Sequence, residues 1–189
     1  MRNLILSGLL ALGLADAASA QQTDPQVSQD PTAEDASVQF GGPDPVRIVT
    51  AVGDEYEIMA EIAATPEQKQ RGLMWRETIE PGTGMLFHYD PAEPASMWMR
   101  HTLVDLDLIY IDPAGVVVKI IAFAQAESLR SLSSDATVAG VLELGAGQAI
   151  EMGLRPGDTV HHAFFDNEQA EVTPSEETAA AQESDGEAQ

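Results

Sequence analysis

The chain has 189 residues, and its 31 acidic against 9 basic side chains give a formal net charge of −22 at pH 7. This length predicts a single domain, and the acidic balance excludes nucleic acid as a natural partner, because phosphate binding needs a basic patch. Because the chain contains no cysteine, disulfides, a lipid-anchoring thiol, a thiolate metal site and a cysteine nucleophile are also excluded.

Residues 1–20 have the features of a signal peptide. A cation at Arg2 precedes an apolar run from Leu4 to Ala15, and the small residues 18–20 match the pattern that signal peptidase recognises. The apolar run is shorter than the ~20 residues that a membrane-spanning helix needs. We therefore expect cleavage before Gln21 and a periplasmic or secreted protein, with no stable membrane insertion after cleavage.

Two polar segments flank the expected domain. Residues 21–45 are rich in Gln, Asp, Ser and Pro and are predicted to form a disordered linker. Residues 166–189 carry eight acidic and no basic side chains among Ala, Ser, Gln and Thr, a composition typical of a disordered acidic tail. The single folded domain is expected to span residues 46–165.

The domain is expected to begin with a β-hairpin. Residues 46–51 are rich in Val, Ile and Thr, and they end at a turn around Gly53 and Asp54. Residues 56–63 alternate apolar and polar side chains, as a strand with one exposed face does.

A short helix follows, from Thr65 to about Trp75. Thr65 has the position of an N-cap, Pro66 that of the first helical residue, and Gln68 that of the capping-box partner. Gly72 costs ~1 kcal/mol of helix propensity relative to alanine, which indicates that another backbone passes close to it.

Short apolar segments separated by Gly and Pro turns predict the remaining strands. These strands are residues 85–89, 96–102, 106–111, 116–123, 138–144 and 159–165. The two central ones, 106–111 and 116–123, are expected to pair as a hairpin. Residues 125–137 are predicted to form a loop, and 147–153 a helical turn. The pattern predicts a mainly β fold, an antiparallel β-sandwich or barrel-like domain with one short α-helix and a minor helical turn.

Several phrases of the sequence resemble one family. They are Thr65-Pro66-Glu67, Arg71-Gly72-Leu73-Met74-x-Arg76, Gly84-Met85-Leu86-Phe87, Trp98-Met99-Arg100-x-Thr102, Leu106-Asp107, Val141-Leu142-Glu143-Leu144-x-Ala146-Gly147 and Gly153-Leu154-x-Pro156-Gly157-Asp158-x-Val160. Together, and in this order, they resemble the exported family known as domain of unknown function 192. The resemblance implies a compact β-sandwich-like domain with a short helix, and no established activity, cofactor or catalytic residue. Two positions depart from the family: His101 stands where Asn is common, and Asp105 where a proline is usual.

The strand 96–102 suggests a ligand-binding groove. If it is extended, Trp98 and Arg100 share one face. Trp98 is then the floor of a groove, with Arg71, Arg76 and Arg100 as cationic walls that hold a carboxylate or a sugar, because a guanidinium binds carboxylates in a bidentate manner. Thr102 and Asp107 complete this set. The alternative role of the three arginines is ion pairing with Asp105, Asp107 or Glu77.

The opposite face of the same strand suggests a metal site instead. Met97, Met99 and His101 have the spacing i, i+2, i+4. Two thioethers and an imidazole suit Cu(I), because soft ligands select it. The ordinary alternative is that the methionines fill gaps in the core.

A hydrolase is the third possibility. Asp105 and Asp107 are predicted to share a strand face, with His101 as a proton shuttle. No Ser-His-Asp order, Gly-x-Ser-x-Gly turn, phosphate loop or His-Glu-x-x-His helix occurs in the sequence. We therefore favour a non-catalytic binding module, without a cofactor, for a small polar or anionic ligand or for a protein or saccharide partner. A Cu(I)-binding protein and a hydrolase remain the alternatives.

Overall fold

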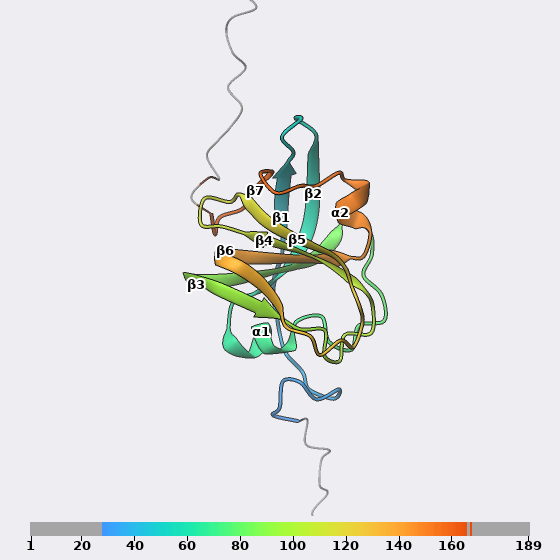
Figure 1. Ribbon diagram of the computed structural model, residues 1–189. Helices are drawn as coiled ribbons and strands as arrows, with labels where there is room; N and C mark the ends of the chain where they lie inside the picture. The colour runs from blue at the N-terminus through green and yellow to red at the C-terminus, as the bar shows by residue number, and fades with distance from the viewer. Residues whose placement is uncertain (1–27, 166, 168–189) are drawn as a thin grey trace, which may run out of the picture.

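The computed structural model describes residues 28–165 and 167 (Figure 1). Within this part of the chain there are seven strands and two short helices. Their order is β1 (Gly41–Val49), β2 (Glu55–Ala63), α1 (Pro66–Arg71), β3 (Thr83–Met97), β4 (Leu106–Ile111), β5 (Val117–Ala124), β6 (Leu132–Gly145), α2 (Gln148–Glu151) and β7 (Thr159–His161).

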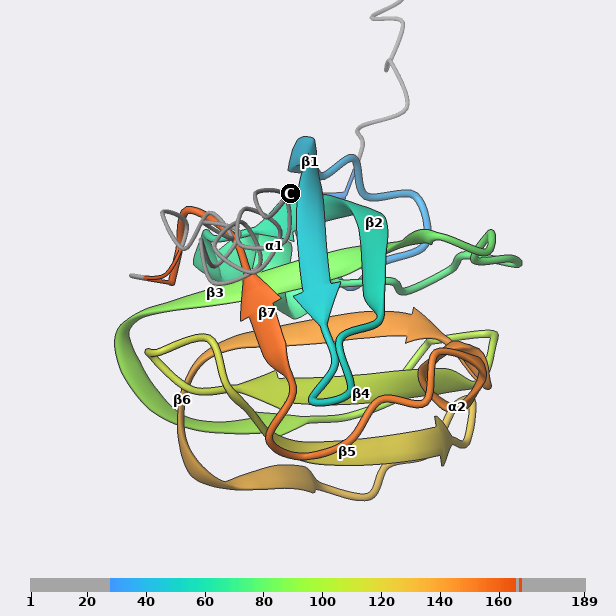
Figure 2. The same cartoon turned by 90° about the horizontal axis from the view of Figure 1, so that it is seen from above.

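The strands form one curled sheet with the order β5-β4-β6-β3-β2-β1-β7. All neighbouring pairs are antiparallel except β2 and β3, which are parallel. A parallel pair needs a long crossover, and residues 64–82 with α1 supply it. Figure 2 shows β3 and β6 bending together, and an isolated bridge from Val116 to Thr159 connects the start of β5 to β7. The sheet is therefore a half-barrel, which confirms the mainly β, barrel-like prediction.

Each face of the central strands packs into its own apolar cluster. Leu86, Ile109 and Leu142 belong to one cluster, whereas their neighbours Phe87 and Leu108 belong to the other. Successive side chains of a strand point to opposite faces, so β4, β3 and β6 separate the two clusters. All six residues of β4 are buried, as its apolar sequence predicts.

Helix α1 has the predicted capping box. The backbone N–H of Gln68 donates to Thr65 Oγ1 (3.2 Å), and that of Thr65 donates to Gln68 Oε1 (3.0 Å). The helix ends at Arg71, earlier than predicted, because Gly72 adopts φ 47°. A Cβ at Gly72 would lie 3.0 Å from the ring of Phe87. The close neighbour of Gly72 is therefore an aromatic ring rather than a backbone.

Several strand boundaries differ from the prediction. The strand expected at 85–89 is part of a longer β3, because the Pro-containing segment after it still pairs with β6 through Glu93 and Pro94. β3 ends at Met97, so most of the second expected strand, 96–102, lies outside it. The expected loop 125–137 contains the start of β6. The last strand, β7, has only three residues. The hairpin of β4 and β5 is confirmed.

Part of the predicted linker packs against the domain. β1 begins at Gly41, and Thr32 is buried. The carbonyl oxygen of Thr32 accepts a hydrogen bond from Trp75 Nε1 (3.0 Å). The predicted signal peptide, and the acidic tail apart from Asn167, lie outside the described residues. Among the described residues, no helix is long and apolar enough to cross a membrane.

Candidate functional site

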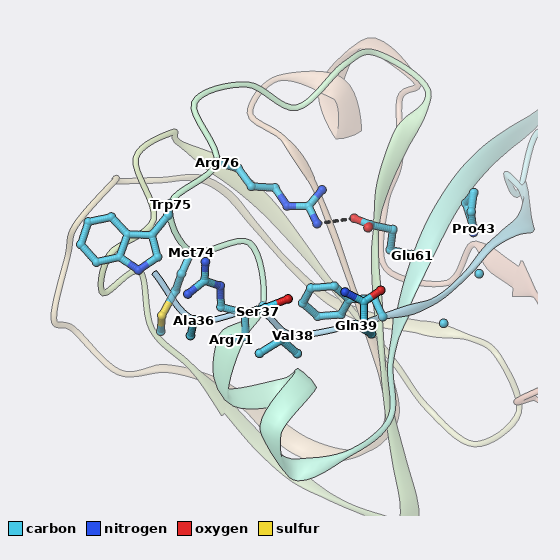
Figure 3. Close-up of a pocket in the computed structure, with 14 residues that line it drawn as sticks. Ala36, Ser37, Val38, Gln39, Pro43, Glu61, Arg71, Met74, Trp75 and Arg76 are labelled. Atoms are coloured by element: carbon cyan, nitrogen blue, oxygen red, sulfur yellow. Dashed lines mark ion pairs between the residues drawn. The ribbon is translucent and has the colours of Figure 1, made fainter. Parts of the chain in front are cut away.

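A pocket of about 490 Å³ opens beside α1, and we call it the Arg71 pocket. One wall is formed by residues 36–43, and the other by Glu61 and residues 71, 72 and 74–76. Figure 3 shows Arg76 extending to Glu61 along one side and Arg71 lying beside Met74 and Trp75. Arg71 and Arg76, both predicted to bind a ligand, are therefore brought together in one pocket.

The two arginines of this pocket have different partners. Arg76 forms an ion pair with Glu61 (Nη2 to Oε2, 2.5 Å). Arg71 donates from Nη1 to the carbonyl oxygens of Pro31 (3.2 Å) and Ala33, and from Nη2 to that of Glu34 (3.5 Å). Carbonyl groups satisfy hydrogen bonds but carry no compensating charge. Desolvation and the nearby charge of Arg76 lower the pKa of Arg71.

Trp75 and His101 form the junction between the helix loop and the end of β3. Both residues have left-handed backbones, with φ 67° and 58°. The backbone N–H of Trp75 donates to the carbonyl oxygen of His101 (2.8 Å), and the side-chain rings of the two residues stack with centroids 4.7 Å apart. Asn and His are among the residues that tolerate this conformation best. The backbone geometry thus accounts for a histidine where the family commonly has Asn.

Trp98 and Arg100 both face solvent, so they share one side of the segment as expected, although β3 ends just before them. Trp98 is 45% exposed, and the Arg100 guanidinium lies over its ring, 5.6 Å from the centroid. Arg100 Nε also donates to His101 Nε2 (3.1 Å). Within the described chain Arg100 has no ion pair with a carboxylate. It does not pair with Asp105, Asp107 or Glu77, the acids proposed from the sequence.

A second, smaller pocket of about 20 Å³ lies between α1 and the end of β3, and we call it the Glu143 pocket. Arg71, Trp98 and Thr102 line it, together with Glu143 of β6. Three of the six predicted ligand-binding residues therefore meet here. Arg71, Gly72 and Met74 line both pockets, which are therefore neighbours.

Sequence reasoning missed Glu143 as a site residue. Its side chain is 3% exposed. No group in residues 28–165 or 167 donates a hydrogen bond to its carboxyl group. Burial raises the pKa of Glu143 to about 8. The available signal was a single acid within the apolar run 138–144.

Asp107 lies in the core and lines neither pocket. Its Oδ1 accepts from the N–H of Phe123, and its Oδ2 accepts from the N–H groups of Gly147 and Ala149, each at 2.9 Å. Asp105 is exposed and precedes β4, so the two carboxylates do not share a site. Asp107 is a structural carboxylate that ties β4 to β5 and α2.

The three predicted copper ligands are not arranged on one strand face. Met97 and Met99 are 8% and 0% exposed and belong to an apolar cluster. β3 ends at Met97, so the alternation of side chains does not extend to His101, whose ring stacks on Trp75. Among the described residues, no group of three or more His, Asp or Glu side chains has the arrangement of a metal site.

The family and structural relatives agree with this fold. The family model of domain of unknown function 192 (DUF192), an uncharacterised family, matches residues 48–162. A crystal structure from Sinorhizobium meliloti 1021, described as a "putative transcription regulator", is 35% identical with a TM-score of 0.66, and the match covers 69% of this chain and 100% of that one.

A crystal structure of a protein of unknown function from Novosphingobium aromaticivorans DSM 12444 is 31% identical with a TM-score of 0.60. That match covers 62% of this chain and 84% of the other. No curated protein matches the chain. Because the family model spans more than half of the sequence, this chain belongs to the DUF192 family.

Proposed function

We propose that this protein is a non-catalytic binding module for a small anionic ligand, and that the Arg71 pocket is its site. The observation that carries the proposal is the Arg71 guanidinium, which lines a pocket of about 490 Å³ and has only neutral carbonyl partners. Pockets of a few hundred Å³ are of the size that holds small ligands.

The remaining hydrogen-bonding capacity of Arg71 suits an oxyanion. A guanidinium has five N–H donors, and the three carbonyl contacts leave Nε–H and one Nη2–H. Two free N–H groups of a guanidinium can bind a carboxylate or phosphate oxygen pair in a bidentate manner. A bound anion would also relieve the repulsion between Arg71 and Arg76. The proposed ligand class is therefore a small carboxylate or phosphate compound.

The net charge of −22 limits where on the protein surface an anion can bind. An anion is repelled over most of such a surface and is accepted only where local cations reverse the potential. The same charge argues against a nucleic-acid partner, and therefore against extending the description of the Sinorhizobium relative to this chain.

The test is a titration of the full chain with succinate and with inorganic phosphate at constant ionic strength, followed by thermal denaturation and calorimetry. We expect saturable binding of at least one anion and a rise in Tm. Arg71→Gln should weaken binding at least tenfold. Arg155→Gln is the matched control, because it removes the same charge from the turn after α2 and should leave binding unchanged.

Two results would contradict the proposal. One is the absence of saturable binding of either anion to the unmodified chain. The other is an equal loss of binding in Arg71→Gln and Arg155→Gln, which would indicate a general effect of charge instead of a site.

We further propose that the module works outside the cytoplasm. The support is the sequence of residues 1–20, which has a cation, an apolar run and a small-residue cleavage pattern. N-terminal sequencing of the protein recovered from the periplasm or medium should begin at Gln21. A chain that retains Met1, or one found only in the cytoplasm, would contradict this proposal.

A further inference from the structure

The Glu143 pocket contains a buried acid without a partner. Glu143 lies on β6 and faces the apolar cluster that includes Phe87 and Met97. Its carboxyl group borders the pocket, yet it accepts no hydrogen bond from any of residues 28–165 or 167. Buried polar groups are hydrogen-bonded to protein or water in the large majority of cases, so a hydrogen-bond donor that enters this pocket finds a free acceptor in the Glu143 carboxyl group.

The two cationic side chains that line this pocket, Lys69 and Arg71, contact groups other than Glu143. Lys69 Nζ donates to the carbonyl oxygen of His88 (3.1 Å) and lies over the Tyr89 ring. The Arg71 guanidinium is held by carbonyl groups of residues 31–34. Neither cation therefore neutralises Glu143.

The two nearby tyrosines do not donate to Glu143 either. Tyr89 of β3 donates its hydroxyl proton to Met97 Sδ (3.4 Å), and Tyr110 of β4 donates to the carbonyl oxygen of Leu132 (2.6 Å). Burial is the larger cause, and the charge of Glu143 the second, of a rise in the pKa of Tyr89 to about 12. The same two causes raise the pKa of Tyr110. Glu93 adds to the shift of Tyr89, and Asp135 to that of Tyr110. Both hydroxyl groups therefore stay protonated, and each donates its proton to an acceptor other than Glu143.

We propose that the Glu143 pocket binds the ammonium head of a primary alkylamine, with the Glu143 carboxylate as counter-ion and Trp98 at the mouth. This site is distinct from the anion site proposed above. Its volume of about 20 Å³ exceeds the 10–15 Å³ that one water-sized group needs. An ammonium group therefore fits, whereas a quaternary ammonium does not.

The chemistry of the lining favours an amine over other small groups. Lys69 and Arg71 also line the pocket, but their hydrogen bonds go to backbone carbonyl groups and not to Glu143. An ammonium instead gains a carboxylate partner, donates hydrogen bonds to it, and leaves its alkyl stem against Phe87, Met97 and the exposed ring of Trp98. Aromatic rings also attract cations, and the net charge of −22 raises the local concentration of cations.

Amine binding is coupled to proton release. At pH 7 the Glu143 carboxyl group holds its proton, because its pKa is about 8. Binding of an alkylammonium ion converts the acid to the carboxylate, and the carboxyl proton passes to solvent while the ammonium keeps its own. The affinity should therefore rise about tenfold per pH unit up to about pH 8. It should fall again near pH 10, where an alkylamine loses its charge.

The experiment is a calorimetric titration of the full chain with methylammonium chloride between pH 6 and pH 10. We expect about one proton released per methylammonium bound at pH 7, measured by back-titration in unbuffered solution, and almost none at pH 9.5. Tetramethylammonium, which has no N–H and is larger, should bind at least tenfold more weakly.

Glu143→Gln should abolish both methylammonium binding and proton release. The matched control is Glu151→Gln, which removes an exposed carboxylate on α2 and should change neither. Circular dichroism and the near-ultraviolet signal of the tryptophans establish that Glu143→Gln is folded.

Several results would overturn the proposal. They are equal binding of methylammonium and tetramethylammonium, unchanged binding in Glu143→Gln, an affinity that does not depend on pH between 6 and 8, and preferential binding of formate, which would make Glu143 a hydrogen-bond donor to anions. The two proposed sites fail separately, because Glu143 does not line the Arg71 pocket, and Glu143→Gln is expected to abolish methylammonium binding and leave succinate or phosphate binding unchanged.

Discussion

Glu143 and Asp107 are buried acids on neighbouring strands, and their surroundings give them opposite properties. Leu108 and Asp107 of β4 pair with Glu143 and Leu144 of β6, so the two acids point to opposite faces of the sheet. Asp107 accepts three backbone hydrogen bonds. Glu143 accepts none, and its burial raises its pKa from 4.5 to about 8. The first acid organises the fold, whereas the second is costly to ionise and available to a ligand.

This difference predicts a pH-dependent stability for Glu143. Between pH 4.5 and about pH 8, the folded state holds the Glu143 proton and the unfolded state does not. The folded state thus binds more protons, and stability falls as the pH rises. Relative to Glu143→Gln, the free energy of unfolding of the natural chain should fall by ~1.4 kcal/mol per pH unit in this window. It should then be level above about pH 8.

Urea denaturation at several pH values measures this difference, and Glu151→Gln serves as the control for loss of one acidic side chain. A constant difference between the natural chain and Glu143→Gln from pH 5 to pH 8 would show that Glu143 is ionised in the folded state.

The residues of the candidate site were visible in the sequence to different degrees. Arg71, Trp98 and Arg100 stood out because cations and tryptophans are few. The period-2 alternation placed Trp98 and Arg100 on one face, but only the structure shows that this face is the exposed one. Glu143 did not stand out, because an acid in an apolar run has the same appearance whether it is satisfied or not. Its lack of a partner depends on α1, β3 and β4, which come together only in the folded chain.

At the scale of secondary-structure elements, the Asp107 side chain connects β4, β5 and α2. It lies on β4, and it accepts hydrogen bonds from Phe123 of β5 and from Gly147 and Ala149 at the start of α2. The N-cap of α2 is Gly147, which has no side-chain cap of its own. A carboxylate 40 residues earlier in the chain therefore caps this helix, which a local reading of the sequence does not show.

Asp107→Asn should destabilise the protein. The amide nitrogen replaces one acceptor, so at least one buried N–H loses its partner, at a cost of ~1–3 kcal/mol. Urea denaturation followed by circular dichroism measures the loss. Asp105→Asn is the control, because Asp105 is exposed and its side chain accepts a single hydrogen bond, from Ala126 N–H (2.7 Å). An effect of Asp107→Asn no larger than that of Asp105→Asn would contradict the structural role of Asp107.

The sequence predicts which segments are strands more successfully than how they pair. The capping box at Thr65 and the hairpin of β4 and β5 are local features, and both are confirmed. The parallel pairing of β2 with β3 and the order of strands in the sheet depend on contacts between distant segments. Pro91 and Pro94 suggested a break, yet β3 continues because β6 bends with it and pairs beyond the irregular region.

At the scale of the whole molecule, residues 28–40 act as a strap across the candidate site. The side chain of Asp30 accepts hydrogen bonds from the N–H (2.9 Å) and hydroxyl (2.8 Å) of Thr32, which forms a local turn. The carbonyl groups of this turn then bind the Trp75 indole and the Arg71 guanidinium. The strap thus stabilises the domain and occupies part of the hydrogen-bonding capacity of Arg71.

Removal of residues 28–35 of the strap should lower stability and expose Arg71. We compare two chains that both end at Asn167, one beginning at Ser28 and the other at Ala36, so that the wall of the Arg71 pocket is kept. The shorter chain loses the four hydrogen bonds that Arg71 and Trp75 donate to the strap. Each contributes ~1 kcal/mol, and for a domain of this size ~1 kcal/mol corresponds to ~4 °C. The shorter chain should therefore unfold roughly 15 °C lower in a calorimetric scan, and equal Tm values would show that these residues contribute nothing to the fold.

The shorter chain should also bind succinate or phosphate more tightly than the longer one, because the carbonyl groups no longer occupy the N–H groups of Arg71. The same calorimetric titration measures both affinities. An affinity no tighter in the shorter chain would show that these carbonyl groups do not limit anion binding at Arg71.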